Sequence, residues 1–111
     1  EKVDAVEFDS DCESNFNENL QLNNLDAIIP FHNHDVLVWN KFDYDIILAN
    51  INRNVIEGLI PKFKGTKANV ILSGLLKTDY ETIEQICLKQ NFQVKEKIIK
   101  GEWICIKIFA L

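Results

Sequence analysis

The sequence predicts an α/β fold built on a mostly parallel sheet. Segments with a strand pattern alternate along the chain with segments of helical periodicity, which is typical of doubly wound parallel sheets. The apolar run 46–49 is bounded by polar residues, as expected of a buried strand. Towards the C-terminus, residues 100–102 separate two further strand-like segments. So short a connection allows a hairpin but no crossover, so this last pair is expected to be antiparallel.

The first half of the chain is expected to form a strand, a helix and a second strand. Residues 2–7 alternate into a short strand. Ser10 and Glu13 have the spacing of a capping box, which predicts a helix that runs to about residue 24. The apolar face of this helix would carry Cys12, Phe16 and Leu20. Residues 27–31 are interpreted as the second strand, and 32–42 as a loop.

The second half is expected to form a strand, a helix, a strand, a helix and the hairpin. A buried strand is predicted over 44–50, followed by a helical stripe of apolar residues. Pro61 falls inside that stripe, so the helix should kink there or restart with Pro61 in its first turn. The strand 68–74 ends in small residues, and the capping-box spacing of Thr78 and Glu81 predicts a helix to about residue 90. The hairpin strands are expected at 92–99 and 103–109.

Composition narrows the class of protein. The chain has 111 residues, of which 47% are hydrophobic and 26% charged, as expected of one globular domain. The net charge of −5 argues against a nucleic-acid surface, and no stretch approaches the roughly 20 apolar residues of a membrane helix. Three widely spaced cysteines without a CxxC pair indicate reduced, buried thiols in a cytoplasmic protein. Because the chain begins at Glu1 and contains no Met, we expect it to be a piece of a longer protein.

Two strand ends carry the side chains best placed for chemistry. In an open α/β sheet the carboxyl ends of the strands face the ligand crevice, and Asn50 ends the buried strand with an amide that donates and accepts hydrogen bonds. Alternatively, Asn50 is the N-cap of the next helix. Glu7 ends the first strand, where a carboxylate can accept both hydroxyls of a ribose, or it is an exposed acid. Asp9 is interpreted first as a turn residue and second as a ligand contact.

A short histidine motif offers a weaker signal. His32, His34 and Asp35 place three potential metal ligands within four residues, but their spacing matches no closed zinc site. A solvated loop is therefore the interpretation, and no metal is expected.

Three motifs in order resemble those of a known family. The segment Val-Glu-Phe-Asp at 6–9 resembles the acidic segment after the second strand of the ribosomal protein L-11 methyltransferase family, which are class I S-adenosylmethionine-dependent methyltransferases. Leu-Ala-Asn-Ile at 48–51 is similar to the family's Ala-Asn-Ile/Leu after strand four, and Gly-Glu-Trp at 101–103 to its final hairpin. In support of these three motifs, Leu-Ser-Gly at 72–74 resembles the small-residue end of the family's strand five. The likeness spans nearly all 111 residues.

The resemblance implies a Rossmann-like class I methyltransferase sheet, mostly parallel with a C-terminal antiparallel hairpin. It also implies that the first strand and the glycine-rich turn are lacking, because the glycines at 58, 65, 74 and 101 form no G-x-G. In the family that missing strand lies between the second and fourth strands. Residues 1–111 are thus expected to be a single partial methyltransferase domain, from the second strand to the C-terminus.

The resemblance also implies roles for individual residues. Glu7 and Asp9 would bind the cofactor S-adenosylmethionine, and Asn50 would be catalytic, orienting a lysine amine of ribosomal protein L-11 with Ile51 beside it. The loop that carries His32 could touch the adenine. The complete enzyme is expected to be a cytoplasmic monomer with no direct nucleic-acid or membrane partner.

Two other functions stay open. One is a related methyltransferase with a different substrate. The form of the motif that points to base amines has two prolines after the asparagine, whereas here Ile51 and Asn52 follow Asn50, which disfavours a base as the substrate. The other is a non-catalytic remnant or interaction module, which the missing glycine-rich turn favours.

Overall fold

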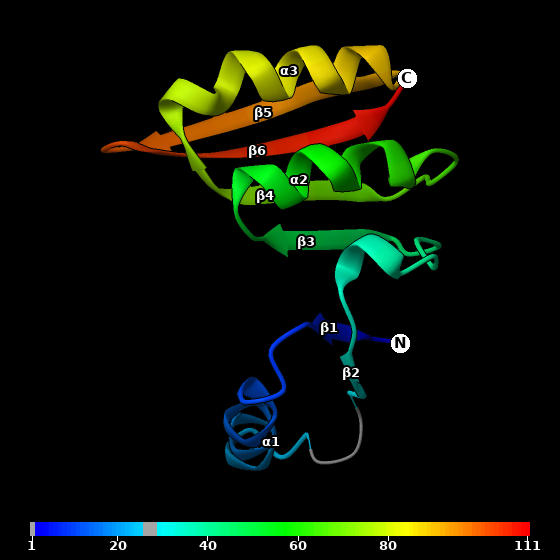
Figure 1. Ribbon diagram of the computed structural model, residues 1–111, viewed down its shortest axis with the longest axis vertical. Coiled ribbons are helices and arrows are strands. Elements are labelled where there is room, and N and C mark those ends of the chain that lie inside the picture. The colour runs from blue at the N-terminus through cyan, green and yellow to red at the C-terminus, as the bar shows by residue number, and fades with distance from the viewer. Residues whose placement is uncertain (1, 26–28) are drawn as a thin grey trace. The chain divides into compact units, whose positions relative to one another are not determined.

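The computed structural model describes residues 2–25 and 29–111, and the chain divides into two compact units (Figure 1). Unit 1 is Glu1–Trp39 and unit 2 is Asn40–Leu111. Each unit contains a sheet of its own, with two strands in unit 1 and four in unit 2. In the described part of the chain, no helix is both long and apolar enough to cross a membrane.

Unit 1 combines a two-stranded parallel sheet with one α-helix. Its elements are β1 (Ala5–Glu7), α1 (Cys12–Leu22), β2 (Phe31–Asn33) and the 3-10 helix η1 (Val36–Val38). The strands pair so that Val6 lies opposite His32. Helix α1 contacts the sheet through Phe16, whose ring centroid lies 5.2 Å from that of Phe31. Among the described residues of this unit, Leu20 is the buried apolar side chain.

Some predictions for unit 1 are wrong in detail. The predicted capping box does not form, because the backbone carbonyl of Ser10, not its side chain, accepts the Glu13 N–H at 3.1 Å and the helix begins two residues later, at Cys12. Strand β2 starts at the end of the predicted strand 27–31, of which 27 and 28 lie outside the described residues. It continues into the predicted loop because His32 and Asn33 bond to groups of the β1 region.

Unit 2 is a four-stranded sheet in the order β3-β4-β6-β5. Its elements are β3 (Ile46–Asn50), α2 (Arg53–Leu59), the 3-10 helix η2 (Ile60–Phe63), β4 (Asn69–Leu76), the 3-10 helix η3 (Lys77–Asp79), α3 (Tyr80–Lys89), β5 (Phe92–Lys100) and β6 (Trp103–Ala110). Strands β3 and β4 are parallel, whereas β6 runs antiparallel to both β4 and β5. The C-terminal antiparallel hairpin is therefore confirmed, as is the α/β fold class.

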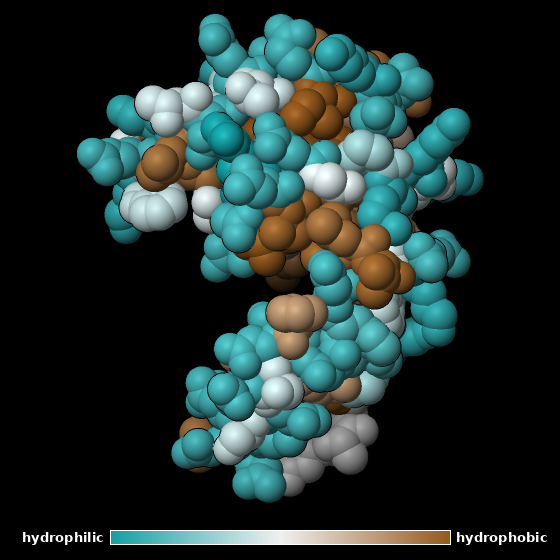
Figure 2. Space-filling model, in the orientation of Figure 1, coloured by the Kyte–Doolittle hydropathy of each residue, from teal (hydrophilic) through white to brown (hydrophobic). Residues whose placement is uncertain are grey.

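The core of unit 2 lies between one face of the sheet and the helices α2 and α3, which lie on the same side in Figure 1. Alternate residues of β4 and β6 are buried on this face, and the helices contribute their apolar stripes. The buried side chains include Ile56, Leu59, Phe63, Val70, Leu72, Leu75, Ile83, Cys87, Ile104, Ile106 and Ile108. On β3, Ile46 and Leu48 remain exposed, and apolar side chains lie at the surface there in Figure 2. The sequence predicted that this strand is fully buried, but β3 is only partly covered.

Three local features of unit 2 refine the sequence predictions. Helix α2 ends at Leu59 and Pro61 lies in the first turn of η2, so the helix restarts at the proline as one of the two alternatives proposed. The predicted capping box at Thr78 does not form, and α3 begins after Asp79 without a side-chain cap. Strand β4 runs past its predicted end through an irregularity at Gly74, where φ is +81°.

Candidate active site

Asn50 lies at the carboxyl end of β3, where it is exposed after the buried Ala49. It pairs with Ser73 of the neighbouring parallel strand, so both strand ends reach the same edge of the sheet. The N-cap of α2 is Asn52, whose side-chain Oδ1 accepts the Val55 N–H at 3.1 Å. The alternative interpretation of Asn50 as the helix cap is therefore wrong, because Asn52 caps α2.

Gly74 supports this strand end by close approach. A Cβ atom at position 74 would lie 2.6 Å from the Ile51 carbonyl oxygen and 3.0 Å from Asn50 Oδ1. Separations under 3.0 Å to backbone atoms require the backbone to shift, so the Asn50–Ile51 segment rests against a glycine α-carbon that no other residue can replace without movement. The sequence marks this place by the small residues that end β4, but it does not reveal what they contact.

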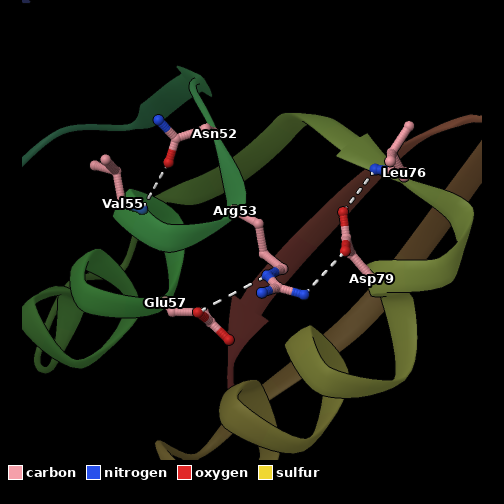
Figure 3. A network of polar contacts seen from close by, with 6 residues as sticks. All are labelled: Asn52, Arg53, Val55, Glu57, Leu76 and Asp79. Atoms are coloured by element: carbon pink, nitrogen blue, oxygen red, sulfur yellow. Dashed lines mark hydrogen bonds and ion pairs between the residues drawn. The ribbon is translucent and has the colours of Figure 1, made fainter.

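A polar network connects the segments that follow β3 and β4 (Figure 3). Arg53 begins α2, and its Nη1 lies 3.3 Å from Asp79 Oδ1 while its Nε lies 3.9 Å from Glu57 Oε2. The other carboxylate oxygen of Asp79, Oδ2, accepts the Leu76 N–H at 2.9 Å. One carboxylate thus links the start of α2 to the end of β4. Sequence reasoning missed this network, because Arg53 and Asp79 lie 26 positions apart and no local pattern connects them.

In unit 1, Glu7 lies at the carboxyl end of β1 with an exposed side chain. Its Oε1 accepts the Asp9 N–H at 3.1 Å, and Asp9 Oδ1 in turn accepts the Asp11 N–H at 2.9 Å. The Asn33 side-chain amide donates to the backbone carbonyls of Glu7 at 3.1 Å and Phe8 at 2.8 Å, which fixes this strand end to β2. Sequence reasoning placed Asn33 in a loop and missed that contribution.

The Glu7 carboxylate is a group that could hold the ribose of a nucleoside cofactor. An exposed carboxylate, oriented by a backbone N–H on one oxygen, can accept hydrogen bonds from the two hydroxyls of a ribose. Asp9 has a turn role through Oδ1, which leaves Oδ2 outside that bond. Glu7 and Asp9 are therefore brought together, as are Asn50 and Ile51, each pair within its own unit.

His32 contacts an acidic side chain and an aromatic ring. His32 Nε2 lies 2.9 Å from Asp4 Oδ1, and its ring centroid lies 4.7 Å from that of Trp39. Among the described residues, no group of three His, Cys, Asp or Glu side chains could hold a metal ion.

The expectation of buried thiols holds for Cys87, whereas Cys12 is exposed and Cys105 half-buried. Burial, with the charge of Glu84, raises the pKa of Cys87 to about 11. Partial desolvation and the negative charges of Asp9, Glu7 and Asp11 raise the pKa of Cys12. Raised values keep both groups as thiols near neutral pH, which disfavours a nucleophilic role.

Comparison with known proteins identifies the relatives of this chain. The family model described as "Ribosomal protein L11 methyltransferase (PrmA)" matches residues 1–110. The ribosomal protein L11 methyltransferase of Acetivibrio thermocellus is 31% identical over 99% of this chain and 36% of its own length. That of Prochlorococcus marinus strain MIT 9215 is 31% identical over 95% of this chain and 37% of its own. The chain thus spans little more than a third of these relatives.

Solved structures agree with this result. The ribosomal protein L11 methylase of Lactobacillus delbrueckii subsp. bulgaricus is 26% identical and superimposes with a TM-score of 0.91, over 99% of this chain and 58% of that one. M. jannaschii TYW2, determined in complex with AdoMet, gives a TM-score of 0.72 at 13% identity, over 99% of this chain and 58% of that one. At that identity the second likeness concerns the fold alone.

Proposed function

This chain belongs to the ribosomal protein L11 methyltransferase family, and we propose that it is part of an S-adenosylmethionine-dependent enzyme that methylates lysine amines of ribosomal protein L11. The observation that carries the proposal is the Asn50 amide, which lies against Gly74 at the carboxyl end of a parallel strand while Asn52 caps the helix. An amide so placed is available to an incoming substrate.

S-adenosylmethionine, when bound, supplies an electrophilic methyl group. Asn50 Oδ1 accepts a hydrogen bond from an N–H of the neutral substrate amine and so fixes the direction of the nitrogen lone pair, with Ile51 beside it. Positioning of this kind supplies a large part of the catalysis of group transfer. Glu7 accepts hydrogen bonds from the ribose hydroxyls, and the backbone N–H of Asp9 donates to the Glu7 carboxylate and so orients it.

A protein amine is the acceptor that the motif favours. Asn50 is followed by Ile51 and Asn52, without the two prolines that the family resemblance associates with base amines. The net charge of −5 also disfavours a nucleic-acid substrate. We propose a cytoplasmic enzyme that is monomeric when complete.

The deciding experiment compares two asparagines in the complete enzyme. Asn50→Ala should slow single-turnover methylation of ribosomal protein L11 on the order of a hundredfold, with little change in cofactor affinity. The matched control Asn52→Ala removes the α2 cap, so it should cost about 1 kcal/mol of stability and slow turnover far less than Asn50→Ala does. In the same series, Glu7→Ala should weaken cofactor binding and spare the rate at saturation. Wild-type turnover of Asn50→Ala at a temperature where it is folded would refute the catalytic role.

A further inference from the structure

We propose that Arg53 and Asp79 form a clamp that positions the Asn50 amide for methyl transfer. The clamp is the ion pair between Arg53 Nη1 and Asp79 Oδ1, 3.3 Å apart. Neither residue is assigned contact with the substrate or the cofactor, so both are positioning residues. The proposal rests on the proposed role of Asn50.

The clamp joins the two loops that follow the adjacent parallel strands β3 and β4. Arg53 comes three residues after Asn50, and Asp79 comes three residues after the end of β4. Because Asp79 Oδ2 also accepts the Leu76 N–H at 2.9 Å, the carboxylate is anchored to β4 itself (Figure 3). The guanidinium is therefore held against a fixed point of the sheet, not against a mobile side chain.

The segment from Asn50 to Arg53, called the Asn50 loop below, consequently has two supports. The backbone of Ile51 rests on Gly74 of β4, where a Cβ would come within 2.6 Å of the Ile51 carbonyl oxygen. Further along the chain, Arg53 pairs with Asp79, which follows the same strand. The Gly74 contact limits how closely the loop approaches β4, while the clamp limits how far it can lift away. Together they restrict the position of the Asn50 side chain, whose Oδ1 would lie 3.0 Å from a Cβ added at Gly74.

The clamp is better suited to positioning than to stabilising the fold. The Arg53 side chain is 46% exposed, and partly exposed ion pairs add little to global stability because solvent screens them. Glu57 lies farther from the guanidinium, at 3.9 Å from Nε, and belongs to the same helix as Arg53. It cannot link α2 to β4, which makes it a natural control for a loss of negative charge beside Arg53.

A kinetic series in the complete enzyme tests the clamp. Arg53→Gln should slow single-turnover methylation about two- to fivefold, which is the range that a partly exposed ion pair can supply, while KM and cofactor affinity stay within about twofold. Asp79→Asn should slow it to a similar extent. Combining the two should add little, since each already opens the same link. Arg53→Lys keeps the charge and should recover much of the rate, and Glu57→Gln should match the wild type.

The position of the Asn50 amide can be followed without catalysis. With 15N-asparagine in the 111-residue chain, the Asn50 side-chain NH2 resonances are identified by their loss in Asn50→Ala. Arg53→Gln should shift or broaden them, and Glu57→Gln should leave them in place. Unchanged Asn50 resonances in Arg53→Gln would overturn the clamp whatever the role of Asn50. Shifted resonances together with wild-type turnover of Asn50→Ala would support the clamp and refute the proposed function.

Discussion

The two units of this chain hold their candidate site residues by different means. Of the sixteen buried apolar residues among those described, Leu20 belongs to unit 1 and the other fifteen to unit 2. Unit 1 has two short strands and one helix, and a two-stranded sheet is marginal by itself. Unit 2 has four strands with two helices packed on one face, which is sufficient for an independent core.

This difference extends to the candidate residues of each unit. Glu7 is held by hydrogen bonds between side chains and backbone, namely those of Asp9 and Asn33, at exposed positions. Asn50 ends a strand of a packed sheet and rests on Gly74. We infer that the residue proposed to bind the cofactor is carried by the more adaptable part of the chain, and the residue proposed to orient the amine by the more rigid part.

Hydrogen exchange should show the largest contrast between the units. Backbone amides of the central strands β4 and β6 should exchange on the order of 10⁴-fold more slowly than those of β1 and β2, because core strands open only with global unfolding and small sheets open locally. Exchange of the 111-residue chain followed by mass spectrometry measures both in one sample. Similar protection in the two units would mean that the chain unfolds as one cooperative body.

Two phenylalanines test the same contrast by mutation. Phe63 is fully buried in unit 2, with its ring centroid 5.1 Å from Phe42 and 6.5 Å from Phe92, so Phe63→Ala should cost about 3–5 kcal/mol of unfolding free energy. Phe16 of unit 1 is half-buried beside Phe31, and Phe16→Ala should leave the main urea transition of unit 2 within about 0.5 kcal/mol. A large loss from Phe16→Ala would instead show that unit 2 depends on unit 1.

The sequence predicted those elements that depend on residues close together in the chain. The apolar run before Asn50 predicted β3, and the short connection around Gly101 predicted an antiparallel hairpin, because neither inference depends on distant residues. Both predicted capping boxes failed, since backbone groups satisfied the first turn at Glu13 and the Asp79 side chain turned back to Leu76. The Ser/Thr-x-x-Glu spacing makes such a cap possible but does not exclude these competitors.

Contacts between residues far apart in the chain could not be predicted from the sequence. Strand β2 includes His32 and Asn33, polar residues whose extended backbone depends on partners more than twenty positions earlier. The contact of Gly74 with Asn50 and the ion pair of Arg53 with Asp79 also join separate elements, so neither spacing nor composition reveals them. The position of Asn50 was therefore predictable, whereas what holds it there was not.

The smallest expected effect concerns the contact of Gly74 with the Asn50–Ile51 segment. A comparison of two glycines of unit 2 tests it. Gly74 and Gly65 both have positive φ, +81° and +89°, so an alanine at either position incurs the backbone strain of about 1–2 kcal/mol. At Gly65 nothing lies within 4 Å of the new Cβ, whereas at Gly74 the Ile51 carbonyl oxygen lies 2.6 Å away. Gly74→Ala should therefore cost about 1–3 kcal/mol more than Gly65→Ala, as overpacking does.

Urea unfolding with an unchanged m-value measures this difference, because equal m-values show that the extent of unfolding is the same. The backbone of Ile51 follows a packed strand directly, so it cannot withdraw from the new Cβ without disturbing the pairing of Asn50 with Ser73. If Gly74→Ala and Gly65→Ala cost the same, the Asn50 loop moves freely. The site in unit 2 would then be as adaptable as the one in unit 1, and the contrast in rigidity between the two candidate residues would be lost.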